Sequence, residues 1–144
     1  MDYDFVKKEH TPILSLATLY PLYFGIANEM QAAQIAAIVE KQLVFDGAVG
    51  TTTVNTGEQW DYPNGWAPLQ WITVIGLAKY GHKELAYEIA DRWLKLNEKV
   101  FQEEGKMMEK YNVVDTTLLG GGGAYKNQDG FGWTNGVLLK LLKE

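Results

Sequence analysis

Aromatic rings and planar polar groups are concentrated in one stretch of the chain. Residues 59–71 read QWDYPNGWAPLQW and contain three of the five tryptophans. The C–H faces of a sugar stack on indole rings, while its hydroxyl groups need planar hydrogen-bond donors and acceptors. This composition therefore suits a carbohydrate, and the candidate binding residues are Gln59, Trp60, Asp61, Asn64 and Trp66. A structural alternative is an aromatic turn that only packs two helices together.

A carboxylate further along the chain is the candidate for acid–base chemistry. Hydrolysis of a glycosidic bond uses two carboxyl groups, and an inverting enzyme separates them by about 6.5–9.5 Å to admit a water molecule. Most acidic residues of this chain fall on the polar faces of expected helices. Glu109 differs, because it follows Met107 and Met108 and precedes a glycine-rich segment. A glutamate near two lysines is also a common surface charge, so the residues alone leave both interpretations open.

Four consecutive glycines, Gly120–Gly123, open a glycine-rich loop that extends to residue 132. Glycine permits positive φ angles and close approach to the backbone, so we expect a lid or a binding loop here. The candidate contact residues are Gly121, Gly122, Gly123, Ala124 and Tyr125. A phosphate-binding loop is excluded, because no Lys-Ser or Lys-Thr follows the glycines and no strand is expected before them. A plain flexible linker is the simpler alternative.

Together these segments resemble the trehalases, the inverting glycoside hydrolases that split α,α-trehalose into two glucose molecules. The likeness rests on QWDYPNGWAPLQW, on Glu109-Lys110-Tyr111 before the glycines, and on residues 120–137. It covers nearly the whole chain, beginning at Tyr20-Pro21-Leu22-Tyr23. It implies that Glu109 is the general base, which is ionised and deprotonates the attacking water. It also implies that the aromatic stretch and the glycine-rich loop face trehalose or a similar glucoside.

The chain departs from the family pattern in two respects. The family usually has a glutamate directly after the glycines, where this chain has Ala124, and losing that anion is expected to weaken or abolish activity. The family's general acid is an aspartate from an earlier region that also supplies sugar-binding arginines, whereas this chain has one arginine, Arg92. The resemblance therefore implies a missing N-terminal half of the barrel as a partner. The alternatives are an inactive sugar-binding or scaffold fragment and hydrolysis of another α-glucoside.

Composition narrows the other possibilities. The chain has 144 residues, enough for one domain with a core, and its net charge of −5 disfavours nucleic acid and anionic membranes as partners. It has no cysteine, and its two histidines, His10 and His82, are far apart, so we expect no metal site and no cofactor. The N-terminal residues lack an apolar signal core, which favours a cytoplasmic location but leaves the periplasm and secretion open.

Hydrophobic spacing predicts the elements that position these groups. Five helices are expected, at residues 11–28 with Thr11 as its cap, 29–43, 67–80, 83–104, and from Thr134 onward. The helix at 67–80 is apolar nearly all round and is expected to be surrounded, whereas those at 29–43 and 83–104 have a polar face. Residues 44–66 are expected to form a long functional loop, and residues 106–114 a short extended segment.

The predicted fold class is therefore all-α, with marginal strands at most. The resemblance implies that residues 1–144 form a single domain, the C-terminal portion of an (α/α)6 barrel in which six inner helices line a pocket and six outer helices surround them. A partial barrel leaves apolar surface of its inner helices uncovered, so we expect self-association or rearranged packing.

Overall fold

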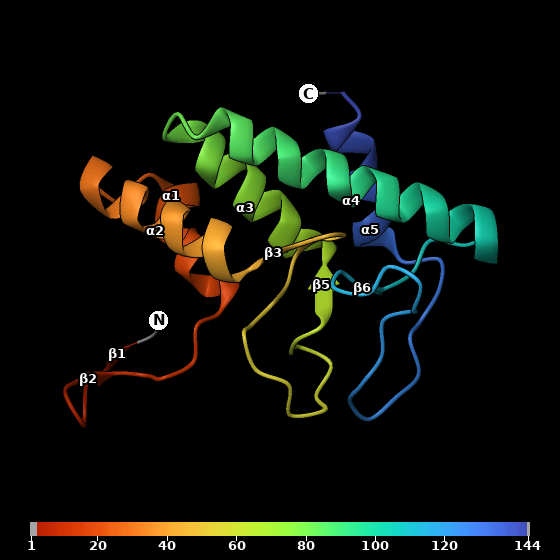
Figure 1. Cartoon of the computed structure of the whole chain (residues 1–144), viewed down its shortest axis with the longest axis horizontal. Coiled ribbons are helices and arrows are strands. Elements are labelled where there is room, and N and C mark those ends of the chain that lie inside the picture. Colours follow the sequence, from red (N-terminus) through yellow and green to blue (C-terminus); the bar gives the residue numbers. More distant parts are fainter. Residues whose placement is uncertain (1–2, 144) are drawn as a thin grey trace.

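The computed structural model describes residues 3–143, which contain five α-helices and three small antiparallel sheets (Figure 1). The helices are α1 (Tyr20–Phe24), α2 (Glu29–Gln42), α3 (Ala67–Lys79), α4 (Lys83–Glu104) and α5 (Gly132–Leu141), with a 3₁₀ helix at Leu16–Leu19 before α1. The two-stranded sheets pair β1 (Tyr3–Asp4) with β2 (Glu9–His10), β3 (Val44–Phe45) with β4 (Ala48–Val49), and β5 (Asn64–Trp66) with β6 (Lys110–Asn112). Within this described part, every helix is too short or too polar to span a bilayer.

Helix α3 is the centre of the molecule. It packs against α1, α4 and α5, and in Figure 1 it lies beneath α4 with its N-terminal end next to β5. Leu69, Val74 and Leu77 are buried, which confirms the prediction that this apolar helix is surrounded. Gly76 allows the close approach of α1, because a Cβ there would lie 3.2 Å from the Cβ of Leu22.

The two predicted amphipathic helices begin and end close to the predicted residues. Asn28 caps α2 in a capping box with Gln31, which satisfies backbone N–H groups at the start of the helix. Helix α4 buries one line of side chains, which includes Ile89, Trp93, Leu96 and Val100. Gly105 adopts φ of +71° at the end of α4, a conformation that favours glycine.

Two predicted helix starts are wrong. Residues 11–15 are not helical, because the backbone of Leu16 bonds to Thr51 and that of Leu14 to Thr53, which ties this segment to a distant loop. Pro21 lies in the first turn of α1, where its missing N–H costs little. Thr134 does not cap α5, because its hydroxyl donates to the carbonyl of Met108 and Phe131 occupies the cap position.

The sheet of β5 and β6 brings the two candidate segments together. These strands lie about 45 residues apart in sequence, and they pair Gly65 with Tyr111 and Trp66 with Lys110. Gly65 is required by packing, since a Cβ there would lie 2.4 Å from Cγ1 of Val113. The expected long loop at 44–66 thus contains strands at both ends, and it extends on the same side of the helices as the glycine-rich loop (Figure 1).

Candidate functional site

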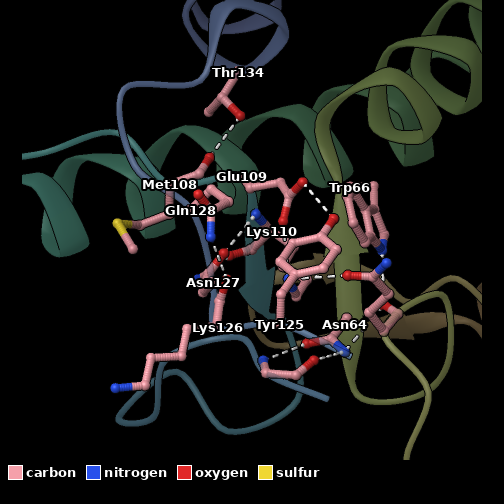
Figure 2. Close-up of polar contacts among 12 residues, drawn as sticks. Asn64, Trp66, Met108, Glu109, Lys110, Tyr125, Lys126, Asn127, Gln128 and Thr134 are labelled. Carbon is pink, nitrogen blue, oxygen red and sulfur yellow. Dashed lines mark hydrogen bonds and ion pairs between the residues drawn. The ribbon is translucent and has the colours of Figure 1, made fainter. Parts of the chain in front are cut away.

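Glu109 lies immediately before β6, and its carboxylate is enclosed by side chains (Figure 2). Only 4% of the residue is exposed. Its Oε2 atom accepts a hydrogen bond from Nζ of Lys110 at 2.9 Å, and its Oε1 atom accepts one from the hydroxyl of Tyr125 at 2.9 Å. Its backbone N–H donates to Gln128 and its carbonyl accepts from the indole of Trp133. The interpretation of Glu109 as a surface charge is therefore wrong.

In the sequence, Lys110 has no role of its own beyond its place in Glu109-Lys110-Tyr111, yet this lysine connects the parts of the site. The residue has no exposed surface. Its ammonium group lies 5.3 Å from the ring centre of Trp66 and 5.0 Å from that of Tyr125, and it donates to Oε1 of Gln59 at 3.4 Å. The one signal in the sequence was its position next to Glu109, and a lysine there is equally compatible with a surface charge.

Three tryptophans form an aromatic wall beside these charges. The rings of Trp60 and Trp66 are stacked 3.8 Å apart and parallel to within 2°. The ring of Trp133, from the start of α5, is nearly perpendicular to both, at 83° to Trp60 and 82° to Trp66. Trp66 is buried and donates its indole N–H to the carbonyl of Gln59, whereas Trp60 is 45% exposed. The wall thus offers an accessible indole to a flat apolar ligand face.

Asp61 and Asn64 have their polar atoms engaged by the protein itself. Asp61 is buried and accepts hydrogen bonds from the hydroxyls of Thr52 and Thr56 and from the N–H of Thr56. Burial acts to raise the pKa of Asp61, but these hydrogen bonds favour the ionised form more strongly, so its pKa lies below the ordinary value. The buried amide of Asn64 donates to the carbonyl of Gly121 at 2.7 Å and accepts from its N–H at 3.1 Å. Both residues thus build the loops around the wall.

The glycine-rich loop packs against residues 57–59. Gly122 and Gly123 have φ of +82° and +76°, and a Cβ on Gly122 would lie 2.8 Å from the carbonyl oxygen of Gly57. The N–H of Gly123 donates to the same oxygen. Residues 120–127 line an open pocket of about 490 Å³, and Ala124 and Tyr125 are among them. These contacts contradict the interpretation of the segment as a plain flexible linker.

Tyr125 joins the glycine-rich loop to the carboxylate. Its hydrogen bond to Glu109 raises the pKa of the Tyr125 hydroxyl, and burial acts in the same direction. The phenol therefore keeps its proton and acts as a donor to Glu109. The structure thus brings Glu109, Tyr125, Gln59, Trp60 and Trp66 to one place, while residues 3–143 hold no group of three or more acidic or histidine side chains suited to a metal ion.

Known proteins share this arrangement of elements. The trehalase family model matches residues 1–144. Periplasmic trehalases from Xanthomonas oryzae pv. oryzae and Xanthomonas axonopodis pv. citri are each 48% identical to the chain over 141 residues, which is 98% of this chain and 25% of each relative. This chain therefore spans about a quarter of the length of these relatives.

Solved structures agree with that relationship. A neutral trehalase from Saccharomyces cerevisiae superposes with a TM-score of 0.82 and 32% identity, over 99% of this chain and 26% of that chain. A mannosylglycerate hydrolase from Thermus thermophilus, solved with glucose, superposes with a TM-score of 0.70 at 21% identity. The match covers 98% of this chain and 34% of that chain, and at this identity it shows a shared fold alone. From the match of the family model over the full chain, we conclude that this chain belongs to the trehalase family.

Proposed function

We propose that this chain supplies part of the active site of an inverting α,α-trehalase, with Glu109 as the general base. The observation that carries the proposal is a buried carboxylate paired with Lys110, whose ammonium lies over the ring of Trp66 in the aromatic wall. Family membership makes trehalose the first substrate to test. The identity of the chain as the C-terminal portion of an (α/α)6 barrel belongs to the same proposal.

In the proposed reaction, Glu109 accepts a proton from a water molecule as that water attacks the anomeric carbon. The glycosidic bond breaks as the new C–O bond forms, and the leaving oxygen takes a proton from a general acid. A carboxylate offers about four lone-pair positions, and the hydrogen bonds from Lys110 and Tyr125 occupy two of them. Glu109 therefore retains acceptor capacity for a water.

The other candidate residues divide into two proposed groups. The exposed indole of Trp60 stacks on a glucose ring, with Gln59 beside it as a hydrogen-bonding group. Trp66 supports Trp60 from behind, and Asp61 and Asn64 hold the loops in position. Direct contact of Asp61 or Asn64 with the sugar stays a prediction, as does contact with residues 121–125.

An inactive sugar-binding fragment is the second candidate function. It is favoured by the contacts of the Asp61 carboxylate and by the alanine at position 124. Asp61 is the other acid among the candidate residues, and its carboxylate is already held by threonines. Ala124 places a methyl group where the family has a carboxylate. On either function, a cytoplasmic location stays a prediction, and the names of the Xanthomonas relatives make the periplasm the competing proposal.

Glucose release from trehalose tests the proposal. The purified chain is assayed alone and together with the remaining part of a trehalase, with maltose as the comparison substrate. Glu109→Gln should lower turnover by about 10²–10⁴-fold, because it removes the proton acceptor without changing the shape of the side chain. Glu104→Gln, on the exposed end of α4, is the matched control and should leave turnover unchanged.

The outcomes separate the candidate functions. Equal turnover by Glu109→Gln and the unaltered chain would refute the assignment of the base. A rise in melting temperature with trehalose, without glucose release under either condition, would favour the sugar-binding fragment. Faster hydrolysis of maltose than of trehalose would favour another α-glucosidase.

A further inference from the structure

We infer that Lys110 is a positioning residue that keeps the Glu109 carboxylate ionised and fixes its direction. The inference rests on the proposed role of Glu109, which it deepens by naming the group that prepares the base. The two residues form an ion pair of 2.9 Å, in which Lys110 is completely buried and the Glu109 side chain nearly so. A buried charge without a partner is strongly unfavourable, so each of these two side chains depends on the other as its ion-pair partner.

The surroundings of the ammonium group restrict it to one position. It lies near the faces of Trp66 and Tyr125, at 5.3 and 5.0 Å from their ring centres, and cation–π attraction stabilises a cation there. Its remaining polar contact is the side-chain oxygen of Gln59. Lysine donates through a compact point charge, so it can sit between two rings while it contacts one carboxylate oxygen.

The backbone of Lys110 is held as firmly as its side chain. Lys110 pairs with Trp66 in the sheet of β5 and β6. The amide of Asn127 accepts from the N–H of Lys110 at 3.3 Å and donates to its carbonyl at 2.9 Å. The ammonium position is therefore fixed from both ends of the residue, and the carboxylate oxygen that it contacts is fixed with it.

The effect on Glu109 follows from the groups that touch its carboxylate. Lys110 supplies a positive charge and Tyr125 supplies a neutral hydroxyl donor, and both favour the ionised form. Around the ammonium, Gln59 and Trp66 are neutral. Removal of the Lys110 charge leaves a buried carboxylate with one neutral donor, so Glu109 should take up its proton at a higher pH.

A carboxyl-carbon NMR titration of the chain with ¹³C-labelled glutamate measures this directly. The Glu109 signal is assigned by its absence in Glu109→Gln. In Lys110→Met, the pH at which this signal titrates should rise, whereas Lys110→Arg, which keeps the charge, should recover much of the original behaviour. Lys106→Met is the matched control, because Lys106 forms an exposed ion pair with Asp129, and it should leave the Glu109 titration unchanged.

A second measurement covers the case in which Lys110→Met does not fold. Because the coupling of two sites is reciprocal, Glu109→Gln should lower the pH at which Lys110 loses its proton, as followed by the ¹³Cε signal of Lys110. A Glu109 titration that is the same in folded Lys110→Met and in the unaltered chain would overturn the inference. A Lys110 titration that is unchanged in Glu109→Gln would also overturn it. If Lys110→Met lowers only the stability of the fold, the role of Lys110 is structural and the inference is overturned.

Failure of this inference is distinguishable from failure of the proposed function. If Lys110→Met shifts the Glu109 titration but no condition gives glucose, Lys110 still prepares the carboxylate and the trehalase proposal fails. If glucose release depends on Glu109 but neither titration shifts, the inference about Lys110 fails alone. In an active protein, Lys110→Met should also shift the acid limb of the pH–rate profile to higher pH, and Lys106→Met should leave it unchanged.

Discussion

Asp61 fixes the loop before β5 through hydrogen bonds to other residues of the same loop. Its carboxylate accepts three hydrogen bonds from Thr52 and Thr56, and this loop carries Trp60. These bonds keep the pKa of Asp61 below its ordinary value of 3.8, despite burial that acts in the opposite direction. The folded chain therefore binds this proton less readily than the unfolded chain does. The resulting stability is complete above the unfolded pKa and is lost as pH falls through the lower folded pKa.

Asp61→Asn should lower the free energy of unfolding by about 1–3 kcal/mol at pH 7, because it removes a buried hydrogen-bonded charge. It should also flatten the loss of stability below about pH 4. Urea unfolding at pH 7 and pH 3 measures both effects. Asp115→Asn is the control: the hydroxyl and N–H of Thr117 lower the pKa of Asp115 in a similar way, but Asp115 is exposed. Equal losses in the two variants would contradict a special role for Asp61.

At the scale of elements, the glycine-rich loop is fastened at several points. Asn64 holds Gly121 from β5, and the carbonyl of Gly57 accepts from Gly123. The hydroxyl of Tyr125 attaches the loop to Glu109 by donating a hydrogen bond to its carboxylate. Positive φ angles and close backbone contact make glycine necessary at Gly122, whereas Gly121 has neither constraint.

Gly122→Ala should displace the loop and destabilise the chain by about 1–3 kcal/mol, because the new Cβ would meet a backbone oxygen and the φ angle disfavours alanine. Gly121→Ala is the matched control, since open space surrounds its Cβ position. Thermal unfolding and tryptophan fluorescence should change in the first variant and remain nearly unchanged in the second. Comparable destabilisation by both would show that the loop needs only general flexibility.

At the scale of the molecule, an apolar groove lies between α4 and α5. It encloses about 510 Å³ and is lined by Leu94, Asn97, Glu98, Phe101, Met107, Asn135, Leu138 and Leu142. Phe101 and Leu142 are 50% and 66% exposed, and the buried Oδ1 atom of Asn97 has no hydrogen-bond partner among residues 3–143. Such a surface favours association, and the relatives are about four times as long as this chain.

We expect the isolated chain to self-associate through this groove. Phe101→Ser should weaken association by about 10-fold or more, because burial of an aromatic side chain contributes about 1.5–3 kcal/mol. Tyr87→Ser, at another exposed aromatic position on α4, is the matched control. Sedimentation velocity over a range of concentrations measures the effect. A monomeric unaltered chain at all concentrations would contradict the expectation.

The sequence determined the elements whose signals are local. The apolar composition of α3 and the single apolar line of α4 were sufficient to predict these helices, because both signals lie within the helix itself. The predicted start of the first helix was wrong because the backbone N–H of Leu16 bonds to the carbonyl of Thr51, a residue 35 positions away. Family resemblance, and not spacing, selected Glu109 from the many acids of the chain.

Tertiary structure alone decided how the candidate groups meet. Tyr125 reaches Glu109 across 16 residues, Gln59 reaches Lys110 across 51, and Asn64 reaches Gly121 across 57. No periodicity or capping pattern encodes such distances, because they depend on the pairing of β5 with β6 and on the packing of both loops. For the same reason, the burial of Lys110 is a property of the folded chain, and a lysine in the sequence indicates only a charge.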